Sequence, residues 1–111
     1  MHELGLCEAI VGAIATRAKE RPVAHVRVRV GALHHVHPEA FDQSFTIAAM
    51  GSVAQDASAD LVLIPATGRC VECQAEFETT DPLLACPKCG GLDVELSGGD
   101  ELTLESIEYR S

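Results

Sequence analysis

The chain has 111 residues and is short of aromatic side chains, with no Trp, one Tyr and three Phe. Its core must therefore be built from Val, Ile, Leu and Ala, because the large rings that fill many protein interiors are scarce. A chain of this length fits one domain, or one small domain that carries a smaller module.

Basic residues are also scarce: eight Lys and Arg stand against seventeen Asp and Glu, a net charge of −9. This charge argues against non-specific binding to nucleic acid or to an anionic membrane, and leaves divalent cations and basic protein surfaces as natural partners. Residues 69–111 hold ten acids and three bases, net −7, whereas residues 1–68 hold seven acids and five bases, net −2. The simplest interpretation of the acidic part is a solvated face, and the alternative is a docking surface for a basic partner.

Long hydrophobic runs are missing from the sequence. The longest, residues 9–15 with Gly12 included, is too short to span a bilayer. The first positive charge is Arg17, so the basic start of a signal peptide is missing, and we expect a cytoplasmic chain whose natural start is Met1. Thiols stay reduced in that compartment, which favours metal binding over disulfides for the five cysteines.

Apolar periodicity predicts two helices. Apolar side chains recur every three or four positions in residues 4–21, and Pro22 is expected to end this first helix. Cys7 lies on the apolar stripe, where a free Cys acts as a small buried hydrophobe. A second stripe, from Pro38 to just before Gly51, predicts the other helix.

Strict alternation of Val with His and Arg over residues 25–30 predicts a half-buried strand, with His25 on its solvent face and Gly31 at its end. Shorter apolar patterns predict strands at residues 61–64 and 101–109.

The region between the last two strands differs in composition, because cysteine pairs, Gly and Pro mark a small turn-rich module. We therefore predict an α+β fold with two helices on a three-stranded mixed sheet, formed by residues 1–66 and 100–111. A zinc-ribbon domain with four cysteine ligands is expected to be inserted at residues 67–99.

Two C-x-x-C pairs, Cys70–Cys73 and Cys86–Cys89, are separated by twelve residues. Four thiolates at about 2.3 Å complete a closed tetrahedral zinc shell with no open position for catalysis, so we interpret this zinc as structural. Iron in a rubredoxin-like electron carrier is the competing interpretation. It is disfavoured because Gln74, rather than Gly, follows the first pair and because aromatic residues are few.

The first three residues form a second candidate metal site. The amine of Met1, the amide nitrogen and imidazole of His2, and the carboxylate or amide of Glu3 are close enough to chelate one ion. Nitrogen-rich, nearly planar donor sets suit Ni(II) or Cu(II). On its own this motif is weak, since any chain can begin with Met.

Several motifs occur in order along the chain: Met-His-Glu-Leu-x-Leu-Cys at the start, a Val-Arg-Val-x-Val-Gly-Ala-Leu strand, Phe41-x-x-x-Phe45, the two cysteine pairs and a closing Ser-Ile-Glu. This combination covers essentially the whole chain and resembles the hydrogenase nickel-incorporation proteins of the HypA/HybF family. One departure is Gly5, where that family usually has Ser. If the Ser caps the first helix, its loss to Gly costs only about a few tenths of a kcal/mol.

The resemblance implies a nickel metallochaperone rather than an enzyme. It implies one Ni2+ as transient cargo at Met1, His2 and Glu3 of the first, nickel-binding domain. It also implies a structural Zn2+ held by Cys70, Cys73, Cys86 and Cys89. The partners implied are a nickel-handling GTPase, the large subunit of [NiFe]-hydrogenase and, in some organisms, urease accessory proteins.

Two alternatives stay open at this point. His34, His35 and His37 lie outside the family motif, and the favoured interpretation is a solvated loop, with an auxiliary ligand or a second, weaker nickel site as the alternative. The rival function is a zinc-ribbon interaction module or transcription adaptor, which explains the cysteines but not the first three residues. The net charge of −9 and the lack of a basic-aromatic stripe count against that adaptor.

Overall fold

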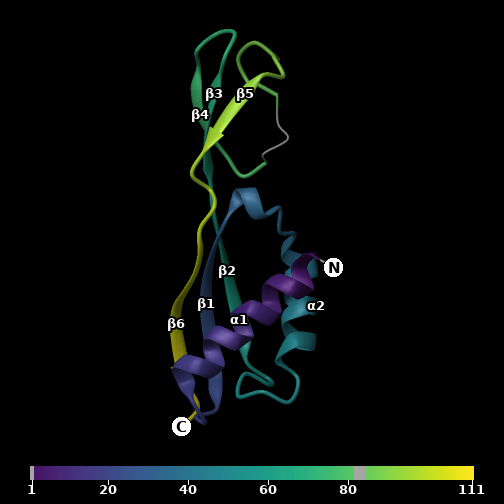
Figure 1. The fold of residues 1–111 in the computed structure, drawn as a ribbon, viewed down its shortest axis with the longest axis vertical. Helices are drawn as coiled ribbons and strands as arrows, with labels where there is room; N and C mark the ends of the chain where they lie inside the picture. Colours follow the sequence, from purple (N-terminus) through teal and green to yellow (C-terminus); the bar gives the residue numbers. More distant parts are fainter. Residues whose placement is uncertain (1, 82–84) are drawn as a thin grey trace. The chain divides into compact units, whose positions relative to one another are not determined.

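The computed structural model describes residues 2–81 and 85–111 (Figure 1). In chain order its elements are α1 (His2–Ala18), β1 (Val23–Gly31), the 3-10 turn η1 (Ala32–His34), α2 (Pro38–Ala49), β2 (Ser58–Ile64), β3 (Ala66–Cys70), β4 (Glu76–Thr79), β5 (Val94–Ser97) and β6 (Leu102–Tyr109). The chain divides into a helical unit, Met1–Arg29 with Val36–Val62 and Thr103–Ser111, and a ribbon unit, Val30–His35 with Leu63–Leu102. The predicted α+β class with two helices is confirmed.

The first sheet has the strand order β2-β1-β6 and is mixed. His25 of β1 contacts both Ser58 and Asp60 of β2, and Arg27 also approaches Asp60, so β1 and β2 run in parallel. The amide of Arg110 donates to Pro22 at one end of β1, which makes β6 antiparallel to β1. Helix α2 is the crossover between the two parallel strands, as such a connection requires.

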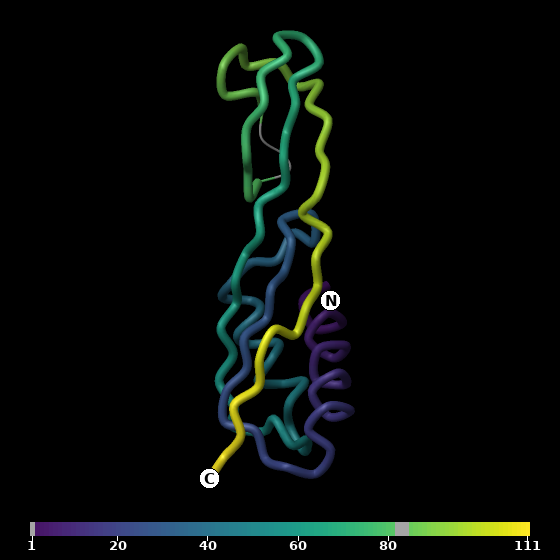
Figure 2. The backbone as a smooth tube through the Cα atoms, turned by 90° about the vertical axis from the view of Figure 1, so that its left-hand side faces the viewer, coloured from purple at the N-terminus to yellow at the C-terminus, as the bar shows by residue number. Residues whose placement is uncertain are grey.

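Both helices lie on one side of this sheet (Figures 1 and 2). The core of the helical unit lies between them and the sheet, because Val26 and Val28 of β1 are fully buried together with Ile14 of α1. The rings of Phe41 and Phe45 stack with centroids 6.1 Å apart. The alternation predicted for this strand is confirmed, and Ile47, on the outer side of α2, is 55% exposed.

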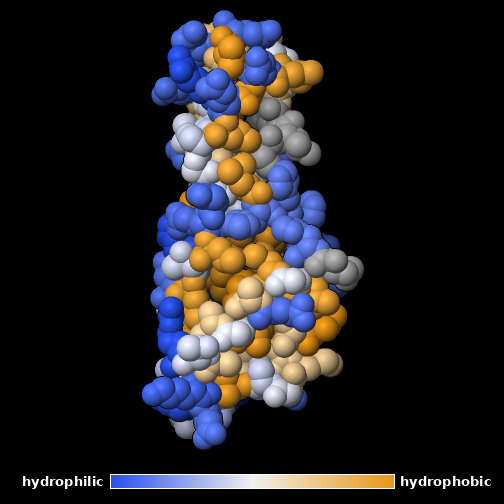
Figure 3. Space-filling view, in the orientation of Figure 1, coloured by the Kyte–Doolittle hydropathy of each residue, from blue (hydrophilic) through white to orange (hydrophobic). Residues whose placement is uncertain are grey.

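The opposite face of the sheet carries charged side chains instead of a helix. His25 Nε2 lies 3.0 Å from Asp60 Oδ2, and Arg29 Nη1 lies 3.5 Å from Glu105 Oε1. These partly exposed pairs each contribute at most about 1 kcal/mol. His25 is on the solvent face as predicted, and its ring also lies 2.6 Å from Ser58 Oγ. On the face shown in Figure 3, hydrophobic residues gather over the helical unit between charged ones.

Helix α1 differs from its prediction at both ends. It begins at His2 rather than Leu4, and it ends at Ala18, before the Pro22 that was expected to end it. The reason is Lys19, whose φ of 59° turns the chain out of the helix. Gly5 therefore lies inside the helix and is not its cap. No helix within residues 2–81 and 85–111 is long and apolar enough to cross a membrane.

The ribbon unit contains a second sheet with the strand order β4-β3-β5, antiparallel throughout. Gly68 pairs with Phe77 and Leu96 on its two sides. A Cβ atom on Gly68 would come within 2.6 Å of the Phe77 ring, so the ring covers the bare backbone of this glycine. Farther along, Gly99 adopts a φ of +71° and packs on Ala66.

We expect truncation of Ile14 to weaken the helical unit strongly. Ile14 is fully buried, so Ile14→Ala should lower the free energy of unfolding by about 2–5 kcal/mol. Ile47→Ala is the matched control in the other helix, and its cost should stay below about 0.5 kcal/mol because the side chain is exposed. Urea unfolding followed by helical circular dichroism measures both, and equal losses would contradict this core.

Candidate metal centres

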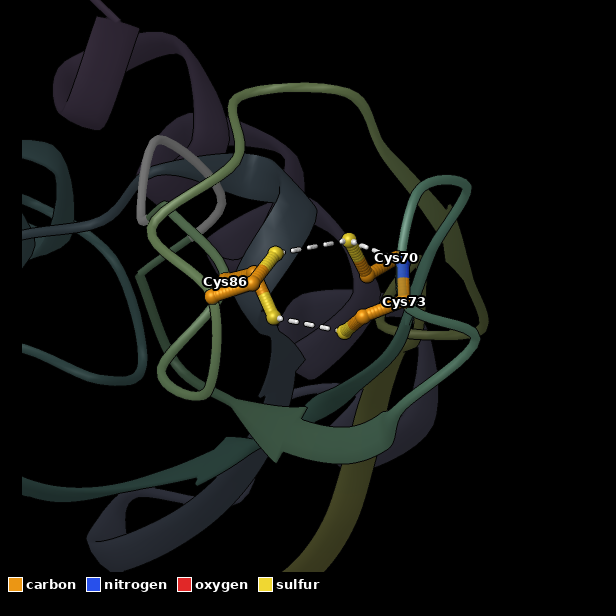
Figure 4. A group of neighbouring side chains, drawn as sticks. Cys70, Cys73 and Cys86 are labelled. Atoms are coloured by element: carbon orange, nitrogen blue, oxygen red, sulfur yellow. Dashed lines mark hydrogen bonds between the residues drawn. The ribbon is translucent and has the colours of Figure 1, made fainter.

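The four cysteines of the two C-x-x-C pairs lie together in the ribbon unit. Their sulfur atoms are all within 4.8 Å of one another. Cys70 Sγ lies 3.5 Å from Cys89 Sγ, and Cys73 Sγ lies 3.6 Å from Cys86 Sγ. The side chains of the labelled cysteines point toward one another in Figure 4. Four sulfurs at about 2.3 Å from a zinc ion are about 3.8 Å apart in a tetrahedron, so this donor set fits structural zinc.

The two cysteine turns share one backbone pattern. The amide of Cys70 donates to the carbonyl of Ala75, and that of Gln74 donates back to Cys70. In the second turn Cys86 donates to Gly91, and Gly90 donates back to Cys86, with the same spacing. Each turn therefore presents its sulfurs by the same local geometry.

This shared pattern explains the backbone conformation of Gln74. Gln74 has a φ of 65°, and the equivalent residue of the second turn, Gly90, has a φ of 74°. The position demands left-handed backbone, which Gly adopts freely and other residues adopt at a cost. The side-chain oxygen of Gln74 accepts a hydrogen bond from Arg69 at 2.9 Å.

Backbone amides point at the sulfurs and favour the thiolate forms that bind metal. The amide of Cys73 donates to Cys70 Sγ at 3.5 Å, and the amide of Gly91 donates to Cys89 Sγ at 3.4 Å. The N–H groups of Cys89 and Lys88 lower the pKa of Cys86 to about 6, despite the opposing effect of burial. Such N–H donors are what a four-thiolate site needs around it.

The second candidate site lies at the start of α1. Met1 is outside the described residues, whereas His2 and Glu3 form the first turn of the helix. The first four amides of a helix have no carbonyl partner within it. A metal ion that binds the amide nitrogens of His2 and Glu3 would therefore break no helical hydrogen bond.

The carboxylate of Glu3 is held by a segment far along the chain. Its Oε2 accepts a hydrogen bond from the backbone N–H of His37 at 3.4 Å. The backbone N–H of Glu3 itself lowers the pKa of this carboxyl most, and the His37 amide and the charges of His2 and His37 lower it further. Sequence reasoning missed this contact, because nothing in the sequence relates the start of the first helix to the residue before the second.

The remaining candidate residues have other surroundings. His34 Nε2 lies 3.0 Å from the carbonyl oxygen of Asp100 in the ribbon unit, and His35 is exposed with a φ of 54°. Cys7 is fully buried, as predicted, with its sulfur 3.7 Å from the carbonyl of Phe41. Burial raises the pKa of Cys7 to about 11, aided by the charges of Glu3 and Asp42, so this thiol stays protonated near neutral pH.

A small α+β unit together with a four-cysteine ribbon defines a class of protein that pairs a structural metal module with a second functional module. Comparison with known sequences identifies the family. The sequence model described as "Hydrogenase/urease nickel incorporation, metallochaperone, hypA" matches residues 1–109, and the chain belongs to this HypA family.

Individual relatives agree with this assignment. The chain is 37% identical to the hydrogenase maturation factor HypA 2 of Bradyrhizobium diazoefficiens over 111 residues, covering 97% of this chain and 98% of the relative. It is 35% identical to hydrogenase maturation factor HypA of Rhodopseudomonas palustris strain BisB5, with the same coverage of 97% and 98%. The solution structure of the Ni metallochaperone HypA from Helicobacter pylori has a similar fold, with a TM-score of 0.59 and 24% identity over 98% of this chain and 97% of that one.

Removal of one clustered thiol should abolish stable zinc binding. We expect purified Cys86→Ser protein to lose most of its zinc, since a buried donor of the cluster is replaced by a weaker ligand. Cys7→Ala is the matched control and should retain the native zinc content. Elemental analysis after dialysis measures both, and full zinc in Cys86→Ser would exclude this cluster as the site.

The residue with left-handed backbone in each cysteine turn allows a second test of how these turns bind zinc. In Gly90→Ala the new Cβ meets no atom within 4 Å, so only the φ of +74° opposes it. That conformation costs about 1–2 kcal/mol, which should weaken zinc binding about 5- to 30-fold in competition with a chromophoric chelator. Gln74→Gly, at the equivalent position, should bind zinc at least as tightly as the native chain. Native affinity in Gly90→Ala would contradict the inferred strain.

Proposed function

We propose that this chain is a nickel metallochaperone that binds one Ni2+ at Met1, His2 and Glu3 and delivers it for maturation of [NiFe]-hydrogenase. The observation that carries the proposal is the match of the HypA family along residues 1–109, which includes the N-terminal motif as well as the cysteine pairs. A zinc-ribbon adaptor is not favoured, because that function leaves the helical unit and its N-terminal motif without a role.

The zinc and nickel roles are assigned to different parts of the chain. We propose that residues 1–66 and 100–111 form the nickel-binding domain and that residues 67–99 form the zinc-ribbon domain. Cys70, Cys73, Cys86 and Cys89 are the proposed zinc ligands, and their closed arrangement supports a structural ion without catalytic chemistry. No reaction is assigned to the chain itself, so it is proposed to act as a carrier rather than an enzyme.

The nickel site has the properties that release requires. Its donors lie at the start of one helix, and Glu3 is only half-buried. An open set of ligands can be exchanged one at a time with those of a receiving protein, whereas four thiolates enclose their ion. We therefore expect a nickel dissociation constant in the micromolar range, or about −8 kcal/mol.

The proposed partners follow from the role in hydrogenase maturation. They are a nickel-handling GTPase, the large subunit of [NiFe]-hydrogenase and, where the host makes urease, its accessory proteins. The cytoplasm is the proposed compartment, since reduced thiols are needed for the cysteine cluster. Residues 69–102 of the ribbon unit hold eight acids and two bases, and this acidity would suit a basic partner.

The nickel site can be tested by titrating Ni(II) into zinc-loaded protein that begins at an authentic Met1. We expect one equivalent to bind at micromolar strength, and we expect both His2→Ala and a form with extra residues before Met1 to lose it. The extension keeps every side chain but buries the amine in a peptide bond, so it isolates the amine as a donor. Equal binding by all three forms would place the ion elsewhere.

A further inference from the structure

The structure separates three histidines that the sequence presents as one group. His34 and His35 belong to the ribbon unit, and His37 belongs to the helical unit together with His2 and Glu3. The ring of His34 lies against the carbonyl of Asp100, and His35 is exposed in left-handed conformation. Of the three, His37 is the one that the structure brings to the proposed nickel motif.

The contact that brings it there is made by backbone and carboxylate. The N–H of His37 donates to Glu3 Oε2 at 3.4 Å, across 34 positions of sequence. The backbone nitrogen is bonded directly to the Cα, so this hydrogen bond places the Cα of His37, from which its side chain extends, close to Glu3. The helices themselves pack against each other, which is also seen where Cys7 of α1 meets the carbonyl of Phe41 of α2.

The imidazole of His37 is available to a ligand. His37 is the residue that precedes α2, its side chain makes no capping hydrogen bond, and it is exposed. In the described part of the chain its ring nitrogens have no hydrogen-bond partner.

The chemistry of the motif leaves room for another nitrogen. The amine, the amide nitrogen and the imidazole at the chain start are three nitrogen donors, and Glu3 adds a carboxylate or an amide. The carboxylate of Glu3 accepts the N–H of His37, so a second imidazole starts beside this donor set and can supply a further nitrogen to Ni(II). We propose that the imidazole of His37 is a further nickel ligand, brought to the N-terminal motif by the carboxylate of Glu3. This inference rests on the proposed function, because it requires nickel to bind at residues 1–3.

The test compares His37→Asn with the matched variant His35→Asn. Asn is a favoured residue before a helix, so His37→Asn keeps or improves the start of α2. Asn also tolerates left-handed backbone, so His35→Asn fits the φ of 54°. Both variants therefore remove one imidazole two positions apart without weakening the fold, and circular dichroism confirms that.

We expect His37→Asn to weaken nickel binding at least about tenfold in calorimetric titration, and His35→Asn to leave it unchanged. Nickel X-ray absorption supplies a readout that a structural role would not move, because imidazole rings give their own scattering pattern. The native and His35→Asn proteins should show two imidazoles per nickel, and His37→Asn should show one.

Three results would overturn the inference, and they are distinguishable. If His2→Ala loses nickel while His37→Asn binds as the native protein does, the terminal site stands and His37 is no ligand. If His2→Ala itself binds nickel normally, the proposed site falls and the role of His37 falls with it. A loss of affinity in His37→Asn without a change in the number of imidazoles would make His37 a residue that only positions the loop.

Discussion

The ribbon depends on four cysteine sulfurs that lie within 4.8 Å of one another. Thiolates at such distances repel, and only a cation between them removes that cost, so metal binding and folding of this module are linked. The surroundings increase the demand, because residues 69–102 of the ribbon unit hold eight acids and two bases, a net charge of −6. The Phe77 ring over Gly68 adds an apolar contact between paired strands, and the proposed zinc would tie the two cysteine turns together.

The helical unit has the opposite basis for its stability. It has a continuous apolar core of Val, Ile and Phe side chains between two helices and one sheet, and needs no ion to close it. The proposed nickel motif lies at the first turn of α1, outside this core. Amides without a helical carbonyl partner are a property of every helix start, and in this chain the N-terminal His and Glu add side-chain donors to them.

Much of the fold, and the clustering of the four cysteines, could be predicted from local sequence patterns. The Val alternation identified the central strand, and Pro38 identified the first position of α2. The cysteine spacing predicted a sulfur cluster, which the structure contains. The ends of α1 were predicted wrongly. Pro22 was expected to end the helix, but the helix ends earlier because Lys19 adopts left-handed backbone, a conformation that a Lys in the sequence does not predict.

What sequence patterns did not reach was contact between distant segments. The sequence presents His34, His35 and His37 as one cluster. In the structure the 3-10 turn and His35 belong to the ribbon unit, and the chain enters the helical unit at Val36, so His37 is separated from the other two. Likewise the hydrogen bond from His37 to Glu3 depends on how two helices pack. Periodicity shows which face of a helix is buried, but not which residue of another helix meets its first turn.

The two proposed metal sites also differ in how many chain segments supply the ligands, and this difference suits one site to retain its ion and the other to release it. The cysteine turns take sulfurs from two loops tied together by antiparallel strands, so no ligand can leave without disturbing the others. The proposed nickel motif takes adjacent donors from one chain end, and a single hydrogen bond joins it to His37. Soft thiolates and nitrogen donors also prefer different ions, and copper binds nitrogen sites more tightly than nickel. Selectivity for nickel at the second site must therefore come from metal supply and from the receiving partner. A weakly enclosed ion suits this arrangement, because the partner can remove it.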